Sequence, residues 1–569
     1  MTRSNHRFSL ILGILASCWL CAGQAAPTVA VEGAPQAPGH AAIASAHKLA
    51  TEAGLEVLRN GGNAFDAAVA VGSTLAVVEP QSSGIGGGFF AILHRAGSND
   101  DVMLDAREVA PAAVDPADYV DKDGKPNRDA SLNGPLAAGI PGEPAGLVWM
   151  AEHYGKLPLS ASLAPAIRIA RDGFQPDARF LGGVKHRAKV IARYPASRAK
   201  LLPGGKVPEI GWTLRQPDLA NTLERLAKHG NDGFYKGIVA KRLVKAVQRA
   251  GGNWTLDDLA NYKVATHKPI DIDYRGYRIV TVAPPSSGGV AMAEIFNILS
   301  GYDLDKMAAA QRMHYIIEAM RRAFRDHNEY LGDPAFVKMP LDMLLSPFYA
   351  AGLRASILPD KATPSSMLPP ALARDPGMHT THFSVIDKDG NMVAATLTVN
   401  TQFGSCFVAP GTGFVLNNEM DDFALVPNQP NAYGLLGSKA NAPVGGKRML
   451  SSMSPSLVFG KDRAMVIGSP GGSTIITQVL EGILAFIDGE TAGEIVAHPR
   501  FHHQYLPDVV FVEPETFDAA TRKSLTDMGY TLKDRGHWGF MNVVTWDYRS
   551  NRLDAASDPR GDSGLGKVQ

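Results

Sequence analysis

The chain has 569 residues, of which 56 are basic and 56 acidic, so its formal net charge is zero. This balance gives no support for a nucleic acid or an anionic membrane surface as a partner. Hydrophobic residues make up 45% and charged residues 20%, as in soluble globular proteins with a large apolar core. The length predicts two to four domains, although a large α/β fold can form one unit.

The N-terminus has the three parts of a secretory signal peptide. Arg3 and Arg7 precede an apolar run at residues 8–20, and small residues follow. The apolar run is short for a membrane span. The pattern therefore predicts that residues 1–26 are removed and that the mature chain is secreted, with the periplasm as its destination. The alternative is a lipoprotein signal, with an anchor at Cys18.

The chain has 3 cysteines, namely Cys18, Cys21 and Cys406. Removal of the signal peptide leaves Cys406 alone, which excludes an intramolecular disulfide in the mature chain. We expect Cys406 to be packed in the core rather than reactive.

Two helices are predicted near the start of the mature chain. Apolar residues recur at helical spacing over 47–60, and Asn63 is the expected N-cap of a second, buried helix over 64–78. The glycine-rich loop at 82–88 then leads into a strand at 89–93. This loop lacks the P-loop ending and the dinucleotide fingerprint, so its glycines are expected to allow close backbone approach.

The middle of the chain is predominantly helical, and residues 269–282 alternate as two paired strands. The predicted helices of this region cover 219–228, 238–250, a stretch from about 290 onward, and 313–324.

The composition changes near residue 358, where prolines among Ser, Ala and Asp exclude a regular core element. We expect a subunit boundary at the end of this stretch, at residue 379. Beyond it, paired strands and helices favour an α+β architecture with helices outside a sheet core. The predicted strands are 381–386 and 392–400, which form a hairpin, then 413–416, 456–459 and 465–467; the predicted helices are 474–487 and 519–528.

Thr380 stands at the start of the first strand of this hairpin. A Thr-Thr pair opening a strand is ordinary, because β-branched residues suit pleated backbone. A threonine at a free N-terminus, however, is a competent nucleophile, because its own α-amine has a pKa near ~8 and can accept the hydroxyl proton. A cut before Thr380 would create such a nucleophile.

Three further segments carry candidate chemistry. The acidic loop 417–423 does not have the oxygen spacing of an EF-hand, but two carboxylates there could hold an ammonium group. Ser451 and Ser452 precede a strand, where a serine-rich turn is the plainer interpretation. The glycine-rich run 468–473 ends a strand and opens a helix, so its backbone N–H groups could form an oxyanion hole.

Together these segments resemble the γ-glutamyltranspeptidase family, also called glutathione hydrolases, from about residue 41 to residue 558. The stretches that carry the resemblance are 79–88, 107–111, 284–289, 380–384, 396–400, 417–423, 451–455 and 468–473.

The resemblance implies a four-layer αββα N-terminal-nucleophile hydrolase, whose precursor cuts itself into a large subunit (27–379) and a small catalytic subunit (380–569). The two subunits remain associated. Thr380 would attack the γ-glutamyl amide of glutathione and pass the acyl group to water or to an amino acid or dipeptide acceptor. In the same way, the resemblance implies catalytic roles for Thr380, Thr398, Gly471 and Gly472, and substrate binding by Arg107, Asn400, Glu419, Asp422, Ser451 and Ser452.

Residues 427–439, with Tyr433, resemble the lid loop of bacterial members; a plain surface loop is the alternative. No cofactor or metal is expected. The nearest rival function is a related amidase acting on glutaryl or cephalosporin amides or on poly-γ-glutamate. A more distant rival is a secreted binding protein that has lost its activity.

Overall fold

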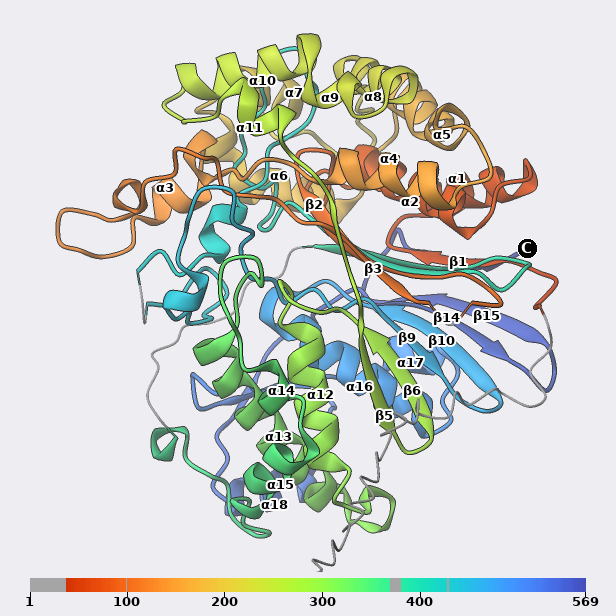
Figure 1. Cartoon of the computed structure of the whole chain (residues 1–569), viewed down its shortest axis with the longest axis vertical. Helices are drawn as coiled ribbons and strands as arrows, with labels where there is room; N and C mark the ends of the chain where they lie inside the picture. Colours follow the sequence, from red (N-terminus) through yellow and green to blue (C-terminus); the bar gives the residue numbers. More distant parts are fainter. Residues whose placement is uncertain (1–36, 99, 369–379, 427–428) are drawn as a thin grey trace, which may run out of the picture.

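The computed structural model describes residues 37–98, 100–368, 380–426 and 429–569. Two stacked β-sheets lie between two layers of helices, as Figure 1 shows. This arrangement confirms the predicted α+β architecture with four layers. The signal peptide, Cys18, Cys21 and the end of the proline-rich stretch lie outside the described residues. Among the described residues, no helix is long and apolar enough to cross a membrane.

The first sheet has seven strands in the order β16-β1-β7-β8-β2-β3-β4, and all its pairs are antiparallel. Its centre is the β7–β8 hairpin, in which Thr381 pairs with Leu397 and Ile386 with Met392. The strands are β1 (Ala42–Ser45), β2 (Gly88–His94), β3 (Val102–Ala106), β4 (Ala265–His267), β7 (Thr381–Ile386), β8 (Met392–Thr398) and β16 (Leu565–Val568).

The second sheet has six strands in the order β15-β14-β10-β9-β6-β5, and a three-stranded sheet, β11-β12-β13, lies apart from it. The strands are β5 (Ile270–Tyr274), β6 (Tyr277–Thr281), β9 (Ser456–Phe459), β10 (Arg463–Gly468), β11 (Phe501–His502), β12 (Val510–Val512), β13 (Leu532–Asp534), β14 (Asn542–Asp547) and β15 (Arg552–Ser557).

Helices cover both outer faces of the sandwich: α2 packs on β7 and β8, whereas α12 packs on β5 and α16 on β10. The α-helices are α1 (Lys48–Arg59), α2 (Ala64–Val78), α3 (Arg128–Leu132), α4 (Glu143–Tyr154), α5 (Leu159–Asp172), α6 (Ala178–Ile191), α7 (Pro195–Leu201), α8 (Pro217–His229), α9 (Asp232–Tyr235), α10 (Gly237–Arg249), α11 (Leu256–Ala260), α12 (Gly288–Leu299), α13 (Ala309–Tyr330), α14 (Leu341–Leu344), α15 (Pro347–Ala355), α16 (Ile475–Ile487), α17 (Ala492–Ala497) and α18 (Ala519–Asp527).

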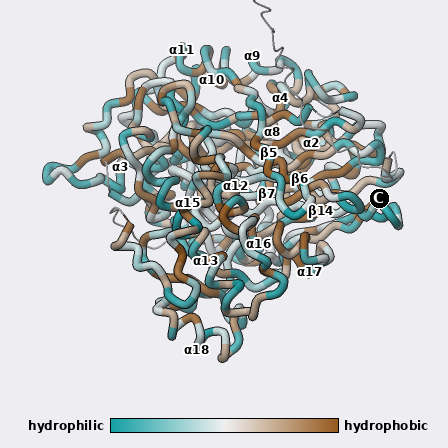
Figure 2. Tube along the Cα trace, turned by 60° about the horizontal axis from the view of Figure 1, so that its bottom comes forward, coloured by the Kyte–Doolittle hydropathy of each residue, from teal (hydrophilic) through white to brown (hydrophobic). Residues whose placement is uncertain are grey.

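Helix α2 shows how local signals and burial agree. The Asn63 side chain caps it by accepting from the N–H groups of Phe65 and Asp66, and the Asp66 carboxylate accepts from the Asn63 N–H. Every residue of α2 is buried, as expected for a helix between a sheet and an outer helical layer. In Figure 2 hydrophilic stretches lie at the outer ends, for example the loop beside α3.

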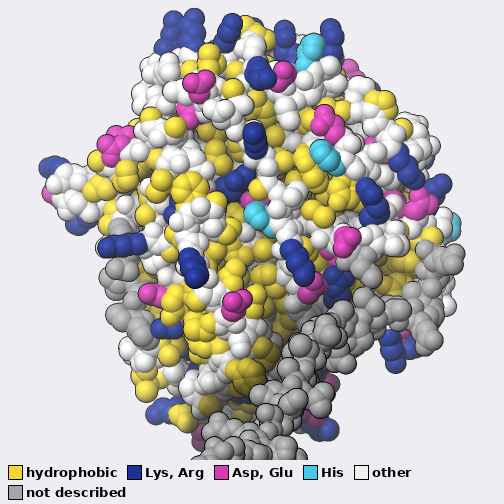
Figure 3. Space-filling view, viewed as in Figure 1, with side chains coloured by type: hydrophobic (Ala, Val, Ile, Leu, Met, Phe, Trp, Pro, Cys, Tyr) yellow, Lys and Arg dark blue, Asp and Glu magenta, His cyan; other side chains and the backbone are white. Residues whose placement is uncertain are grey.

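The surface carries both acidic and basic side chains, as the zero net charge of the sequence leads one to expect. On the face in Figure 3 acidic and basic side chains are interspersed, apart from a row of Lys and Arg along the top edge. Cys406 is fully buried, and its sulfur accepts from Arg187 Nε at 3.2 Å. The expectation of a packed cysteine is therefore confirmed.

The predicted strand at 413–416 is wrong. Val415 makes only an isolated bridge with Val408, and no named strand covers the run. Gly413 lies against the start of α8, where an added Cβ would come within 2.1 Å of the Leu219 nitrogen. Tight packing on a helix explains why this apolar run, which was predicted to be a strand, is buried without strand pairing.

Candidate active site

Thr380 lies directly before β7 and is 4% exposed. Its hydroxyl donates to Thr398 Oγ1 at 3.2 Å, and Thr398 Oγ1 also accepts from the Asn400 N–H at 2.7 Å. The hairpin register places Thr380 beside the end of β8, where Thr398 is the last residue. The predicted nucleophile and its supporting threonine are therefore in contact.

The glycine loop at 82–88 lies behind this pair. An added Cβ at Gly87 would meet the Thr398 carbonyl oxygen at 2.0 Å, and one at Gly86 would meet the Val415 oxygen at 2.0 Å. The Asn417 amide donates to the Gly86 oxygen at 2.8 Å and so ties the loop to the acidic segment. The predicted role of these glycines, close backbone approach, is confirmed.

Arg107 joins the acidic segment to the same cavity. Its guanidinium, 1% exposed, lies 2.8 Å from Glu419 Oε2 through Nη1 and 2.6 Å from Asp422 Oδ2 through Nη2. Glu108 Oε2 is 3.6 Å from Nη1. Burial acts to lower the pKa of Arg107, but the three carboxyls outweigh it and raise the value.

The three carboxyls are themselves affected by burial. Burial raises the pKa of Glu419 to about 7 and that of Glu108 to about 8, in each case against the opposing effect of Arg107. Burial and the neighbouring Glu419 also raise the pKa of Asp422. One guanidinium thus faces three carboxyls, and the site can accommodate a further positive charge.

The pair Ser451 and Ser452 is held by the turn at 284–289. The Ser451 N–H donates to the Pro285 oxygen at 2.9 Å, and the Ser287 N–H and Oγ each donate to the Ser451 oxygen at 2.8 Å. The two serines, 5% and 8% exposed, line the cavity that contains Thr380. Two segments that sequence reasoning recognised separately therefore form one local structure.

Gly471 and Gly472 form the turn between β10 and α16 and have φ angles of +145° and +58°. Such angles favour glycine. An added Cβ at Gly472 would meet Tyr433 Cδ1 at 2.3 Å, so the tyrosine ring packs directly on this turn. Gly472 lines the cavity together with Thr380, as the prediction of an oxyanion site requires.

The comparison with known proteins decides the family. The model of the γ-glutamyltranspeptidase family matches residues 50–568. The chain belongs to this family.

Two relatives share 42% of their residues with this chain, and both are glutathione hydrolase proenzymes. One, from Pseudomonas sp. (strain A14), aligns over 94% of this chain and 96% of its own; the other, from Escherichia coli (strain K12), over 91% and 90%. Among solved structures, a cephalosporin acylase from Bacillus halodurans aligns with a TM-score of 0.80 at 28% identity, over 97% of this chain and 99% of its own. The chain is therefore an enzyme, a γ-glutamyltransferase with the N-terminal-nucleophile hydrolase fold.

The cavity of this γ-glutamyltranspeptidase encloses about 580 Å³, including the space at its mouth. All the predicted site residues line it except Gly471, which directly precedes the lining residue Gly472 in the sequence. The lining side chains that bear on the argument are Arg107, Thr380, Thr398, Asn400, Glu419, Asp422, Tyr433, Ser451, Ser452 and Gly472.

The segment resembling a lid covers part of the cavity. The Tyr433 hydroxyl donates to the Asn400 backbone oxygen at 2.8 Å, and Tyr433 is 4% exposed. The Asn400 side-chain N–H donates to the Asn418 oxygen at 2.9 Å, so the amide oxygen is the end suited to an ammonium. Residues 427 and 428 of this segment lie outside the described residues.

Sequence reasoning missed the residue that anchors this segment. Asp421 Oδ2 accepts from the Ala432 N–H at 2.7 Å, while Oδ1 accepts from Arg128 and Ser131, each at 2.6 Å. The side chain of Asp421 is fully buried, unlike a solvated acidic loop residue. Glu419, Asp421 and Asp422 together indicated a functional loop. The sequence alone did not show that Asp421 is the one whose side chain turns away from the cavity.

Proposed function

We propose that this chain is a self-cleaving γ-glutamyltransferase and glutathione hydrolase with Thr380 as its nucleophile. One observation carries the proposal: a buried threonine hydroxyl at a predicted cleavage point shares a cavity with one guanidinium and a group of carboxyls. The family's activity requires a nucleophile and a receptor for an α-amino acid head. Thr380 supplies the first, and Arg107, Glu419 and Asp422 supply the second.

Self-cleavage begins when Thr380 Oγ attacks the carbonyl carbon of residue 379. The new C–O bond replaces the C–N bond, and the hydroxyl proton ends on the released nitrogen. Water then hydrolyses the ester, which leaves a carboxylate at residue 379 and restores the Thr380 hydroxyl. Thr398, which already accepts from the Thr380 hydroxyl, holds the attacking oxygen in place.

Strand pairing keeps the two products together. β1, which belongs to the large subunit, lies between β7 and β16, which both belong to the small subunit. β2 pairs with β8 and β6 with β9 across the same division. The large subunit (27–379) and the small subunit (380–569) therefore share both sheets.

In turnover the free amine of Thr380 accepts the proton of Oγ, and the oxygen attacks the γ-carbonyl of glutathione. The N–H groups of Gly471 and Gly472 stabilise the oxyanion, each with an effect on rate of roughly 100- to 1,000-fold. The amine of cysteinylglycine takes the proton and leaves. Water, or an amino acid or dipeptide amine, then attacks the γ-glutamyl ester on Thr380.

The charges of the cavity favour a zwitterionic head. The α-carboxylate pairs with Arg107, with Ser451 and Ser452 as further donors, while the α-ammonium pairs with Glu419 and Asp422. Asn400 contributes its amide oxygen to the ammonium. A glutaryl head has no ammonium, so it would add a negative charge beside carboxyls that already share one guanidinium. The structure therefore supports γ-glutamyl over glutaryl or cephalosporin amides.

The test compares hydrolysis of γ-glutamyl and glutaryl anilides by the mature enzyme. We expect a clear preference for the γ-glutamyl anilide, and a preference for glutaryl would overturn the assignment. An Asp422→Asn variant serves as control, because it should lose γ-glutamyl activity selectively. The binding-protein alternative predicts no turnover of either anilide.

The site of action follows from the N-terminal pattern. If residues 1–26 are removed as a signal peptide, the enzyme works free outside the cytoplasm; if the chain is instead cut before Cys18, it works there attached through a lipid at Cys18. Glutathione and other γ-glutamyl compounds would meet it there. Sequencing the N-terminus of the exported protein separates the free form from the lipid-anchored form.

A further inference from the structure

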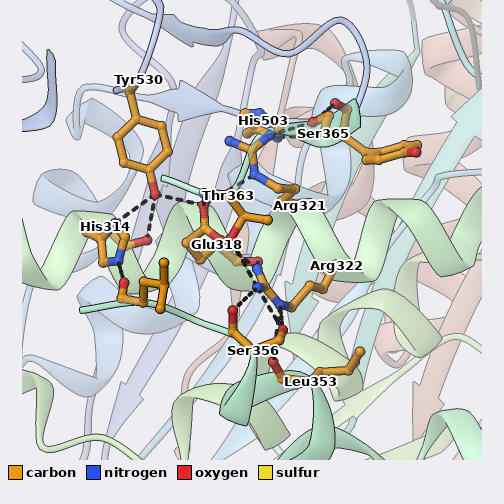
Figure 4. Close-up of polar contacts among 12 residues, drawn as sticks. His314, Glu318, Arg321, Arg322, Leu353, Ser356, Thr363, Ser365, His503 and Tyr530 are labelled. Atoms are coloured by element: carbon orange, nitrogen blue, oxygen red, sulfur yellow. Dashed lines mark hydrogen bonds and ion pairs between the residues drawn. The ribbon is translucent and has the colours of Figure 1, made fainter. Parts of the chain in front are cut away.

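The last described stretch before Thr380, residues 356–368, is held by helix α13 (Figure 4). Arg322 Nη2 donates to the Ser356 oxygen at 3.1 Å and to Thr363 Oγ1 at 3.2 Å. Glu318 Oε1 accepts from the Thr363 N–H at 3.1 Å. One face of a buried helix thus fixes the end of the proposed large subunit.

The proposed small subunit holds the same stretch from the other side. The Ser365 N–H donates to Asp508 Oδ2 at 2.7 Å, and Ser365 Oγ donates to the Tyr505 oxygen at 2.6 Å. The Tyr505 hydroxyl donates to the Leu368 oxygen at 3.2 Å. These contacts join residues that lie on opposite sides of the proposed cut.

Four charged side chains connect the two sets of contacts. Arg321 bonds to Glu318, Asp508 and Ser365, and Arg322 Nη1 lies 2.6 Å from Glu318 Oε2. The side chains of Arg321, Arg322 and Glu318 are at most 2% exposed. Burial opposes ionisation of Glu318, but the two arginines outweigh it and lower its pKa. Two arginines thus balance two carboxylates; Arg321, Arg322 and Glu318 are buried, and Asp508 is 39% exposed.

We propose that Glu318, Arg321, Arg322 and Asp508 form a clamp that positions the chain for self-cleavage before Thr380. The inference rests on the proposed function. The clamp residues are positioning residues, because they act through residues 356–368 and do not touch the reacting atoms. Their side chains contact neither the cavity lining nor Thr380 through any described hydrogen bond.

The position of Ser365 explains why the clamp matters. Arg321 and Asp508 both bond to Ser365, and Asp508 belongs to the proposed small subunit. The clamp therefore fixes Ser365 relative to the strands that carry Thr380. Loss of Arg321 removes one of the bonds that hold Ser365 in this position, while the bonds of Tyr505 to Ser365 and Leu368 remain.

The test follows self-cleavage of the full chain after refolding from denaturant, by intact mass over time. Arg321→Met removes the contacts to Glu318, Asp508 and Ser365, and we expect cleavage to slow by roughly fivefold, the equivalent of one lost hydrogen bond. Arg321→Lys should restore part of the rate because it keeps the charge. Ser365→Ala is a milder variant for the case in which Arg321→Met does not fold.

Arg354→Met is the matched control. The Arg354 guanidinium donates to the oxygens of Asn297 and Ile298 at 3.1 and 3.2 Å, so its loss affects the same helical layer but not the clamp. We expect it to cleave at the parent rate. Once cut, the Arg321 variants should hydrolyse γ-glutamyl anilide with the parent kcat and KM per mole of cut chain.

Two results would overturn the clamp. One is parent-rate cleavage in a folded Arg321→Met chain, and the other is equal slowing in Arg354→Met, which would show a general loss of stability. Failure of the parent chain to yield a fragment beginning at Thr380 would instead overturn the proposed function.

Discussion

Replacing Arg107 by methionine tests the proposed head-group site most directly. The change removes ion pairs of 2.8 Å to Glu419 and 2.6 Å to Asp422 in a position that is 1% exposed. It also removes the proposed partner of the substrate α-carboxylate. Truncating one partner of a buried, hydrogen-bonded charge pair between a protein and its bound partner costs about 2–5 kcal/mol of binding. If about 3 kcal/mol of this is lost from the transition state, kcat/KM falls by roughly 100-fold or more.

The assay is initial-rate hydrolysis of γ-glutamyl anilide by protein whose cleavage has been confirmed by intact mass. Arg107→Met should still cut itself, because self-cleavage uses Thr380 and Thr398 but no head-group contact. Arg107→Lys is the control, since it keeps the charge without the two-point geometry and should show an intermediate loss. A cleaved Arg107→Met enzyme within tenfold of the parent kcat/KM would refute the assignment of Arg107.

Four further changes test the other parts of the site. Thr380→Ala should remain one uncut chain without activity, as intact mass and anilide turnover would show. Thr398→Val should slow self-cleavage by roughly fivefold, because a hydrogen bond contributes about 1 kcal/mol. Burial raises the pKa of Glu419 to about 7, so its carboxyl becomes neutral at lower pH. We therefore expect kcat/KM to fall as the pH drops through that value. The pH–rate profile of Glu419→Gln should lack this fall. Gly472→Ala should lower kcat by about tenfold, measured by the same assay, because a side chain at positive φ costs about 1–2 kcal/mol and its Cβ would meet Tyr433 at 2.3 Å.

Elements with strong local signals could be predicted from the sequence. Helix α2 has an N-cap at Asn63 and an apolar run throughout, and it begins and ends where predicted. The β7–β8 hairpin has strands that contain several β-branched residues, around a turn at 387–390 in which the Gly390 N–H donates to the Asp387 oxygen. In both cases the local pattern and the tertiary environment favour the same structure.

The C-terminal strands could not be predicted in the same way. β14 and β15 form an antiparallel pair, and β16 completes the other sheet by pairing with β1, more than five hundred residues away. The exposed residues of β15 and β16 give little apolar alternation. Their structure depends on partners distant in the sequence, which local periodicity does not reveal.

In the site, too, some features could be predicted from the sequence and others depend on contacts between distant residues. Its residues were identified by resemblance, but the contact between Arg107 and Asp422 joins positions in separate halves of the chain. Asp421, two positions from Glu419, faces Arg128 and Ser131 instead of the cavity. The direction of a side chain in a loop depends on the packing around it, and residue type alone does not determine it.

The proposed head-group site, rather than the fold, would set which acyl group this enzyme accepts. A cephalosporin acylase shares the fold with a TM-score of 0.80, so the layered core does not distinguish the two activities. We propose that the distinction lies in Arg107 with Glu419 and Asp422, where positive and negative groups stand within 2.8 Å of each other. A zwitterion can replace these internal ion pairs by its own, whereas a glutaryl head, with one carboxylate and no ammonium, satisfies only the arginine. Because two buried carboxyls would then lose their partner, the cost of that exchange selects the γ-glutamyl group.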